Sequence, residues 1–222
     1  PRYSSSAASD VYKRQGEYFN REMIRYYDEN EVDFDRLRFY CAWDLAIGQR
    51  ERNDYSVGVV VGVDEYDNLY VVDCIRGKYD GFELVEQILD LFETWRPHVV
   101  GIEKGHIEMA LGPFLQKRVR ERGLNEAYFK DLKVGRRDKE ARARAIQGRM
   151  QQGMVYFPKD PVWVGPLIAE LLRFPNGVHD DQVDALAWIG LMMTEFATFV
   201  EKIEHEPSWR CLLYTSDAAD EE

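Results

Sequence analysis

Carboxylates interrupt three stretches of the sequence that are otherwise apolar. Asp44 lies within the apolar run 39–46, and Glu103 directly follows the run HVVGI. The segment HDDQVDALAW places three more acids at the start of a predicted helix: Asp180, Asp181 and Asp184. Each acid alone has a simpler structural explanation, as a turn residue, a surface acid at a strand end, an N-cap or a first-turn acid favoured by the helix dipole.

Taken together, these acids indicate a metal site. Asp181 and Asp184 are three residues apart, so they share one face of a helix that continues as an apolar segment. A carboxylate beside a buried face is costly unless it is paired or binds a metal. Oxygen ligands without nearby Cys or His favour Mg²⁺ or Mn²⁺. Two such ions about 4 Å apart can activate a water and stabilise a leaving oxygen, which is the chemistry of phosphodiester cleavage.

The elements that must position these acids follow from hydrophobic patterning. The runs 39–46, 56–63 and 69–75 are typical of strands, and their close spacing predicts an antiparallel meander. Asp80 and Glu83 then have capping-box spacing at the start of an amphipathic helix.

A strand at 98–102 follows that helix, and we expect it to run parallel to the first strand. Patterning then predicts helices over 107–122, 138–152, 163–174 and 180–195, a strand over 128–134 and an extended piece over 154–157. This order predicts an α/β fold, in which a mixed sheet of three antiparallel strands and then parallel strands carries helices on both faces.

Length and composition restrict the classes of protein. A chain of 222 residues that is 45% hydrophobic can bury the core of one domain, or of two small ones. Its net charge of −11 excludes a uniformly basic nucleic-acid binder, although not a local basic patch. No apolar run has the length of a membrane span, and nothing at the start is typical of a signal peptide. The three cysteines, at positions 41, 74 and 211, have no metal-ligand spacing and favour a reducing compartment; Cys41 and Cys74 are expected to be buried strand residues.

A basic stretch runs from Lys130 to Arg149. Eight basic residues there face three acidic ones, a local net charge of +5. One interpretation is a surface that follows DNA phosphates without base preference, and the other is a solvated helix face with ion pairs. The DNA interpretation is favoured, because two of these residues fall in an expected loop. The candidate DNA contacts are Lys104, Arg136, Arg137, Lys139, Arg142 and Arg149.

The two ends of the chain differ in hydrophobic patterning from the rest. Residues 1–15 and 211–222 show neither helical nor strand periodicity and resemble translated sequencing-adaptor read-through, the alternative being disordered tails. We therefore expect non-native tails at 1–15 and 211–222. We also expect a helical connector at 16–37, one domain over 38–200 and a tail over 201–222.

Residues 39–194 resemble the nuclease domain of the large terminase subunit of tailed bacteriophages. The resemblance rests on five blocks in order: FYCAWDLA, NDYSVGVVVG, VVGIEKG, ARARAIQGRMQQGMVYFP and LLRFPNGVHDDQVDALAW. It implies a ribonuclease-H-like fold and an endonuclease that cuts concatemeric viral DNA during packaging with two Mg²⁺ or Mn²⁺ ions.

The resemblance also implies roles for single residues. The catalytic metal acids would be Asp44, Glu103 and Asp181, with Asp184 and Asp180 as further ligands and the split among the three aspartates left open. His179 would help to orient the site, or would be no more than a turn residue. Double-stranded DNA, the small terminase subunit and the portal would be the partners, in the cytoplasm of the infected bacterial host.

The chain departs from the complete subunit in one respect. It contains no GxxxxGK[ST] phosphate loop, so we expect the nuclease half without the ATPase motor that normally shares its chain. Two alternatives remain: another ribonuclease-H-like nuclease, such as a junction resolvase or a transposase, or a non-catalytic module that docks DNA or a portal ring.

Overall fold

The computed structural model describes residues 18–46, 55–103, 112–132 and 139–204, with side chains placed up to 196. Its strands are β1 (Arg25–Tyr27), β2 (Arg38–Asp44), β3 (Ser56–Val63), β4 (Leu69–Gly77), β5 (Val99–Glu103), β6 (Phe129–Leu132) and β7 (Val155–Pro158). Its α-helices are α2 (Gly81–Trp95), α3 (Gly112–Glu121), α4 (Lys139–Gln151), α5 (Val164–Leu171) and α6 (Asp181–Glu204). None of these helices is both long and apolar enough to cross a membrane.

The strands form one mixed sheet in the order β1-β7-β4-β3-β2-β5-β6. β2, β3 and β4 pair antiparallel, β5 pairs parallel with β2, and β6 pairs parallel with β5. β3 lies at the centre, and every residue of its valine-rich sequence is buried, as expected for a strand covered on both faces. The predicted α/β architecture is therefore confirmed, including the antiparallel meander and the parallel strand that follows the first helix.

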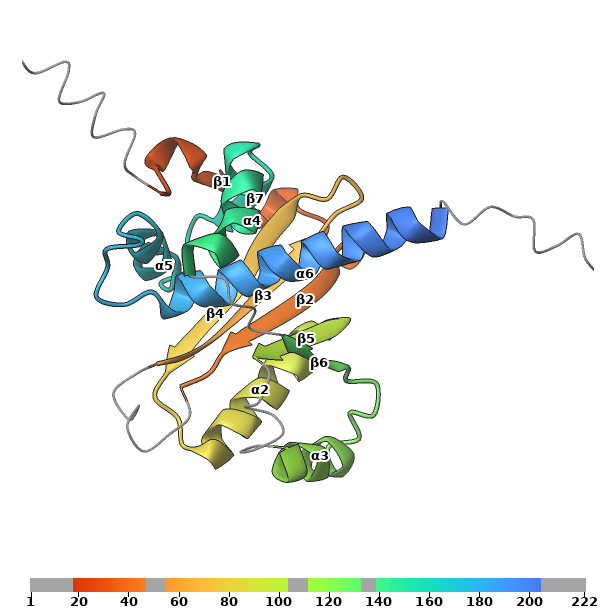
Figure 1. Ribbon diagram of the computed structural model, residues 1–222. Helices are drawn as coiled ribbons and strands as arrows, with labels where there is room; N and C mark the ends of the chain where they lie inside the picture. Colours follow the sequence, from red (N-terminus) through yellow and green to blue (C-terminus); the bar gives the residue numbers. More distant parts are fainter. Residues whose placement is uncertain (1–17, 47–54, 104–111, 133–138, 205–222) are drawn as a thin grey trace, which may run out of the picture.

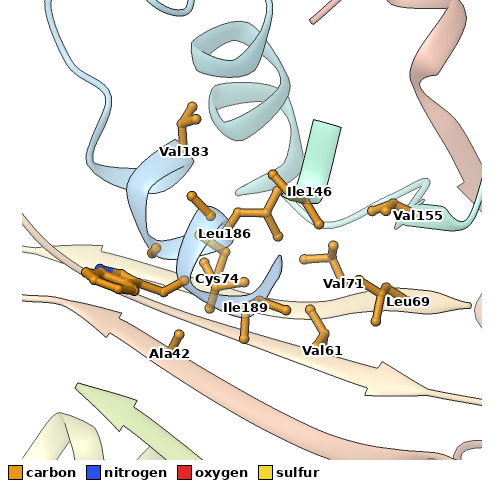
Figure 2. Close-up of a cluster of buried hydrophobic side chains, with 14 of the residues drawn as sticks. Ala42, Val61, Leu69, Val71, Cys74, Ile146, Val155, Val183, Leu186 and Ile189 are labelled. Atoms are coloured by element: carbon orange, nitrogen blue, oxygen red, sulfur yellow. The ribbon is translucent and has the colours of Figure 1, made fainter. Parts of the chain in front are cut away.

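Helices cover both faces of the sheet (Figure 1). One hydrophobic cluster joins α4, α5 and α6 to one face, and a second joins α2 and α3 to the other. Side chains alternate between the two clusters along each strand: Ala42 belongs to the α6 side, whereas Cys41 and Trp43 belong to the α2 side. Figure 2 shows the α6-side cluster, where Leu186 and Ile189 of α6 lie above the sheet.

Local sequence signals explain several element boundaries. The Asp80 carboxylate accepts the backbone N–H groups of Phe82 and Glu83, and the Glu83 side chain accepts the Asp80 N–H, so the predicted capping box is present. Gly153 ends α4 with a positive φ of 73°, which favours glycine. Cys41 and Cys74 are buried strand residues, as predicted.

The segment before β2 differs from the expected connector helix. Its described part, residues 18–37, contains three 3₁₀ turns and strand β1, which pairs parallel with β7 at the edge of the sheet. Asn20, Asp28 and Asp33 each accept a backbone N–H at the start of one turn, and such side-chain bonds compete with a continuous α-helix. The segment packs on the domain, since Phe19 is fully buried and Tyr27 donates a hydrogen bond to the Val71 carbonyl. The expected tails at 1–15 and 211–222 lie outside the described residues.

Candidate active site

Asp44 and Glu103 lie side by side at one edge of the sheet. Asp44 is the last residue of β2 and Glu103 is the last residue of β5. The two strands are parallel, and their register pairs Trp43 with Ile102, so each acid follows directly on that pair. Strand alternation turns both acids to the α6 side, because Ala42 faces the α6-side core and a Cβ on Gly101 would meet Met192 of α6.

The first turn of α6 brings further carboxylates to the same edge. Asp181 begins the helix and Asp184 follows one turn later, with only 5% of its surface exposed. Burial raises the pKa of Asp44 to about 8, and the negative charges of Asp184, Glu103 and Asp181 contribute to this rise. The structure thus brings together carboxylates from two strands and a helix that are about 60 to 140 residues apart in the sequence.

Two basic residues of α4 neutralise part of this charge. Lys139 Nζ lies 2.8 Å from Asp180 Oδ1 and 3.2 Å from Asp184 Oδ2. Arg142 Nη2 lies 3.2 Å from Asp184 Oδ1, and its guanidinium lies over the Trp188 ring. Both residues were predicted to contact DNA, and the structure directs them to the carboxylates because the first turn of α4 packs beside the first turn of α6.

Charged residues of α5 and β4 contact the start of α6. Glu170 of α5 is buried and accepts hydrogen bonds from the Gln182 N–H and side-chain amide, both at 2.7 Å, and a longer one from the Val183 N–H. Arg76, near the end of β4, lies 3.9 Å from Glu170 Oε2 and 3.5 Å from Asp181 Oδ2. Burial raises the pKa of Asp181, Glu170 adds to that rise and Arg76 opposes it.

The donor set suits a hard cation, because it consists of carboxylate oxygens without Cys. Partial burial and three nearby acids raise the pKa of Asp44, so a divalent ion would stabilise the charged form of this side chain. Within the described ranges, no three acidic, His or Cys side chains stand in a ready metal-binding arrangement. Asp184 is instead paired with Lys139 and Arg142 of α4, and Asp181 lies against Arg76.

The other predicted residues have different positions. His179 is half exposed, lies 3.9 Å from Asp181 and packs edge-on against the Tyr55 ring. Arg149 donates to the Asp67 carbonyl in the turn between β3 and β4, at the opposite end of these strands from Asp44, so the structure does not bring it to the acids. The remaining candidate DNA contacts, Lys104, Arg136 and Arg137, lie outside the described residues.

Four residues at the site were not predicted from the sequence: Glu170, Arg76, Gln182 and Tyr55. Glu170 carried a usable signal, since it is an acid within the apolar segment LIAELL, the same kind of interruption that identified Asp44. Arg76 carried a weaker one, because it stands two residues beyond the buried Cys74 on the same side of a strand. Nothing local in the sequence marks Gln182 or Tyr55.

Comparison with known proteins agrees with this fold. The family model of the terminase RNaseH-like domain matches residues 41–193. The large terminase nuclease of the thermophilic phage G20c is 16% identical, with 75% of this chain and 92% of that chain covered and a TM-score of 0.53. A form of that nuclease with bound zinc is 18% identical, with the same coverage and a TM-score of 0.51. A mutant of the large terminase subunit from bacteriophage Sf6, with calcium, is 14% identical, with 78% and 98% covered and a TM-score of 0.53. No curated protein sequence matches the chain.

Proposed function

Because this chain belongs to the family of terminase RNaseH-like domains, we propose that it is a metal-dependent DNA endonuclease, the nuclease part of a phage large terminase subunit. The observation that carries the proposal is the convergence of Asp44, Glu103 and the first turn of α6 at one edge and on one face of the sheet. Its biological role would be to cut concatemeric viral DNA during packaging in the host cytoplasm. The small terminase subunit, the portal and an ATPase motor would be its partners.

The carboxylates would hold two Mg²⁺ or Mn²⁺ ions. Asp44 and Glu103 come from the rigid sheet, and Asp181 and Asp184 come from α6, with Asp180 beside them. When bound, such ions lower the pKa of an attacking water and stabilise the oxygen that leaves the phosphorus. The zinc and calcium recorded with two similar nucleases support a divalent ion here.

Residues around the carboxylates stabilise their arrangement. Glu170 ties the start of α6 to α5, and Arg76 lies between Glu170 and Asp181. Lys139 and Arg142 offset the charge of Asp184 and, with a divalent ion bound by the carboxylates, would be available to contact an incoming phosphate.

A plasmid-nicking assay with Mg²⁺ and with Mn²⁺ tests the proposal. We expect the wild-type protein to convert supercoiled DNA to nicked and linear forms. Asp44→Asn and Glu103→Gln should each lose activity by at least about a hundredfold, since each removes a charged ligand. Asp160→Asn, which changes an exposed turn residue, is the matched control and should cut like the wild type.

Two outcomes would contradict the assignment. Cutting by Asp44→Asn in Mn²⁺ at the wild-type rate would exclude Asp44 as a metal ligand. A wild-type protein that neither cuts DNA nor responds to either ion would favour the non-catalytic docking module. Comparing linear with branched duplex in the same assay separates a packaging nuclease from a junction resolvase.

A further inference from the structure

The edge of the sheet that carries the acids also carries a group of aromatic and basic side chains. We propose that Tyr55, Arg76 and Lys78 form a second contact for nucleic acid, in which Lys78 binds a backbone phosphodiester a few nucleotides from the bond that is cut. This inference rests on the proposed function and adds to it a binding site outside the basic stretch 130–149.

Strand order places this group beside the carboxylates. Asp44 at the end of β2 pairs with Val57, next to the start of β3, and Ser56 pairs with Gly77 at the end of β4. The Ser56 hydroxyl accepts the Ala46 N–H, which joins the ends of β2 and β3. Tyr55 and Lys78 therefore belong to the same edge of the sheet as Asp44.

The group also lies on the same face as the acids. Cys74 faces the α6-side core, where its thiol lies 3.6 Å from the Gln182 side chain, and Arg76 follows two residues later. The contact of Arg76 with Asp181 confirms that orientation. Two strand spacings of about 4.8 Å separate β2 from β4, and the register places Arg76 across from Asp44. Lys78 follows two residues later, so it lies roughly 12 Å from Asp44. Along the axis of duplex DNA, where each nucleotide of one strand rises about 3.4 Å, this distance corresponds to about three to four nucleotides.

Three cationic or aromatic side chains contact the Tyr55 ring. The Arg76 guanidinium lies 3.9 Å from the ring centroid, the Lys78 ammonium lies 5.0 Å from it, and the His179 ring packs against it edge-on. Tyr55 also packs against the α6-side core, which restricts the position of its ring and of the cations that contact it. Two buried nitrogens of Arg76, Nε and Nη2, lack a hydrogen-bond partner in the described structure.

Lys78 differs from the other cations near the acids. Lys139, Arg142 and Arg76 all lie against carboxylates, whereas Lys78 is exposed and forms no ion pair with the described residues. The acids that follow it in the chain, Asp80 and Glu83, accept backbone N–H groups in the capping box of α2. Among the described residues, no carboxylate pairs with its charge, which suits it to bind an anion from outside the molecule.

Single-turnover cleavage of a labelled duplex in Mn²⁺ tests the inference, with the half-saturating protein concentration measured over a series of salt concentrations. For Lys78→Ala we expect that concentration to rise about fivefold to tenfold near 0.1 M salt, and the log–log salt slope to fall by about 0.9, the effect of one lost phosphate contact. The maximal rate should stay within about twofold of the wild type, because Lys78 does not touch the reacting atoms. Lys78→Arg should retain the affinity.

Matched variants separate this contact from general charge and from folding. Lys117→Ala removes an exposed lysine of α3, on the opposite face of the sheet, and should leave both the affinity and the salt slope unchanged. Tyr55→Phe keeps the ring and should behave like the wild type, whereas Tyr55→Ala should weaken binding as Lys78→Ala does, with its thermal unfolding measured alongside.

The outcomes distinguish this inference from the proposed function. If the wild type cuts DNA but Lys78→Ala has the affinity and salt slope of Lys117→Ala, the phosphate contact is wrong and the nuclease assignment stands. If Lys78→Ala lowers only the maximal rate, the contact is likewise excluded. If the wild type does not cut DNA under any condition, the proposed function itself fails.

Discussion

Asp44 shows how one partly buried side chain can be placed for binding at the expense of stability. Its carboxylate stands at the end of a strand, where burial and three further acids raise its pKa, while Arg142 opposes that rise. In a protein without a bound dication, the charged form of Asp44 is therefore unfavourable. The same arrangement makes the group a strong ligand when a dication is present.

The Asp44→Asn variant should be more stable than the wild type in EDTA, by an amount that depends on pH. The folded-state pKa of Asp44 is about 8 and the unfolded value is about 3.9, so the folded protein binds this proton more tightly. Wild-type stability should consequently fall as the pH rises from about 4 to about 8, whereas Asn loses nothing over that window. We expect a difference in the free energy of unfolding of a few kcal/mol near pH 8 and almost none below pH 4.

Urea unfolding of both proteins at a series of pH values measures this difference. Asp160→Asn on an exposed turn serves as the control and should stay within about 0.5 kcal/mol of the wild type. If the stability difference between Asp44→Asn and the wild type does not vary with pH, Asp44 does not cause the pH dependence of the wild-type stability.

At the scale of elements, the close packing of α4 on α6 brings the cations to the acids. Gly190 of α6 faces Ile146 of α4 so closely that an added Cβ would lie 2.7 Å from the Ile146 nitrogen and 3.0 Å from its Cβ. The absence of a side chain at Gly190 lets the two helices approach, and the approach places Lys139 and Arg142 beside Asp180 and Asp184.

Gly190→Ala should therefore destabilise the protein although alanine favours helices. The obstructing atoms belong to backbone and to a buried side chain, so we expect a loss of about 1–3 kcal/mol in the free energy of unfolding. Gly148→Ala in α4 is the matched control: nothing lies within 4 Å of its Cβ position, and it should gain about 0.5–1 kcal/mol from helix propensity. Chemical denaturation gives both values, and a neutral or stabilising Gly190→Ala would show that the helices can move apart at no cost.

For the whole molecule, the candidate ligands connect two layers that meet through apolar packing. Asp44 and Glu103 belong to the sheet, and Asp181 and Asp184 belong to α6, which contacts β2, β3 and β5. An ion shared by these groups would bind the folded chain and not the unfolded one, because unfolding separates the sheet from α6. Metal binding and global stability should therefore be linked.

We expect Mn²⁺ and Mg²⁺ to raise the unfolding temperature of the wild type. A free ion concentration a hundred times the Kd corresponds to about 2.7 kcal/mol of added stability. Asp44→Asn and Glu103→Gln should lose most of this shift, whereas Asp160→Asn should keep it. Differential scanning calorimetry over a range of ion concentrations measures the effect, and equal shifts in all four proteins would place the ion elsewhere.

The sequence by itself determined the features that depend on neighbouring residues. The valine run 56–63 predicted a buried strand, the spacing of Asp80 and Glu83 predicted a helix start, and the strand order predicted the mixed sheet. The interruptions at Asp44 and Glu103 predicted acids at strand ends, because a charge within an apolar run stands out whatever the tertiary structure is.

Only the tertiary structure decided which charged groups meet. The three-residue strand β1 is too short to show a period, and its pairing with β7 depends on how the chain returns to the sheet. Glu170 stabilises the start of α6 from another helix, and Arg149 is held at the opposite end of the strands. Ion pairs and remote caps form between residues far apart in the chain, so their partners are set by how the elements dock and not by local spacing.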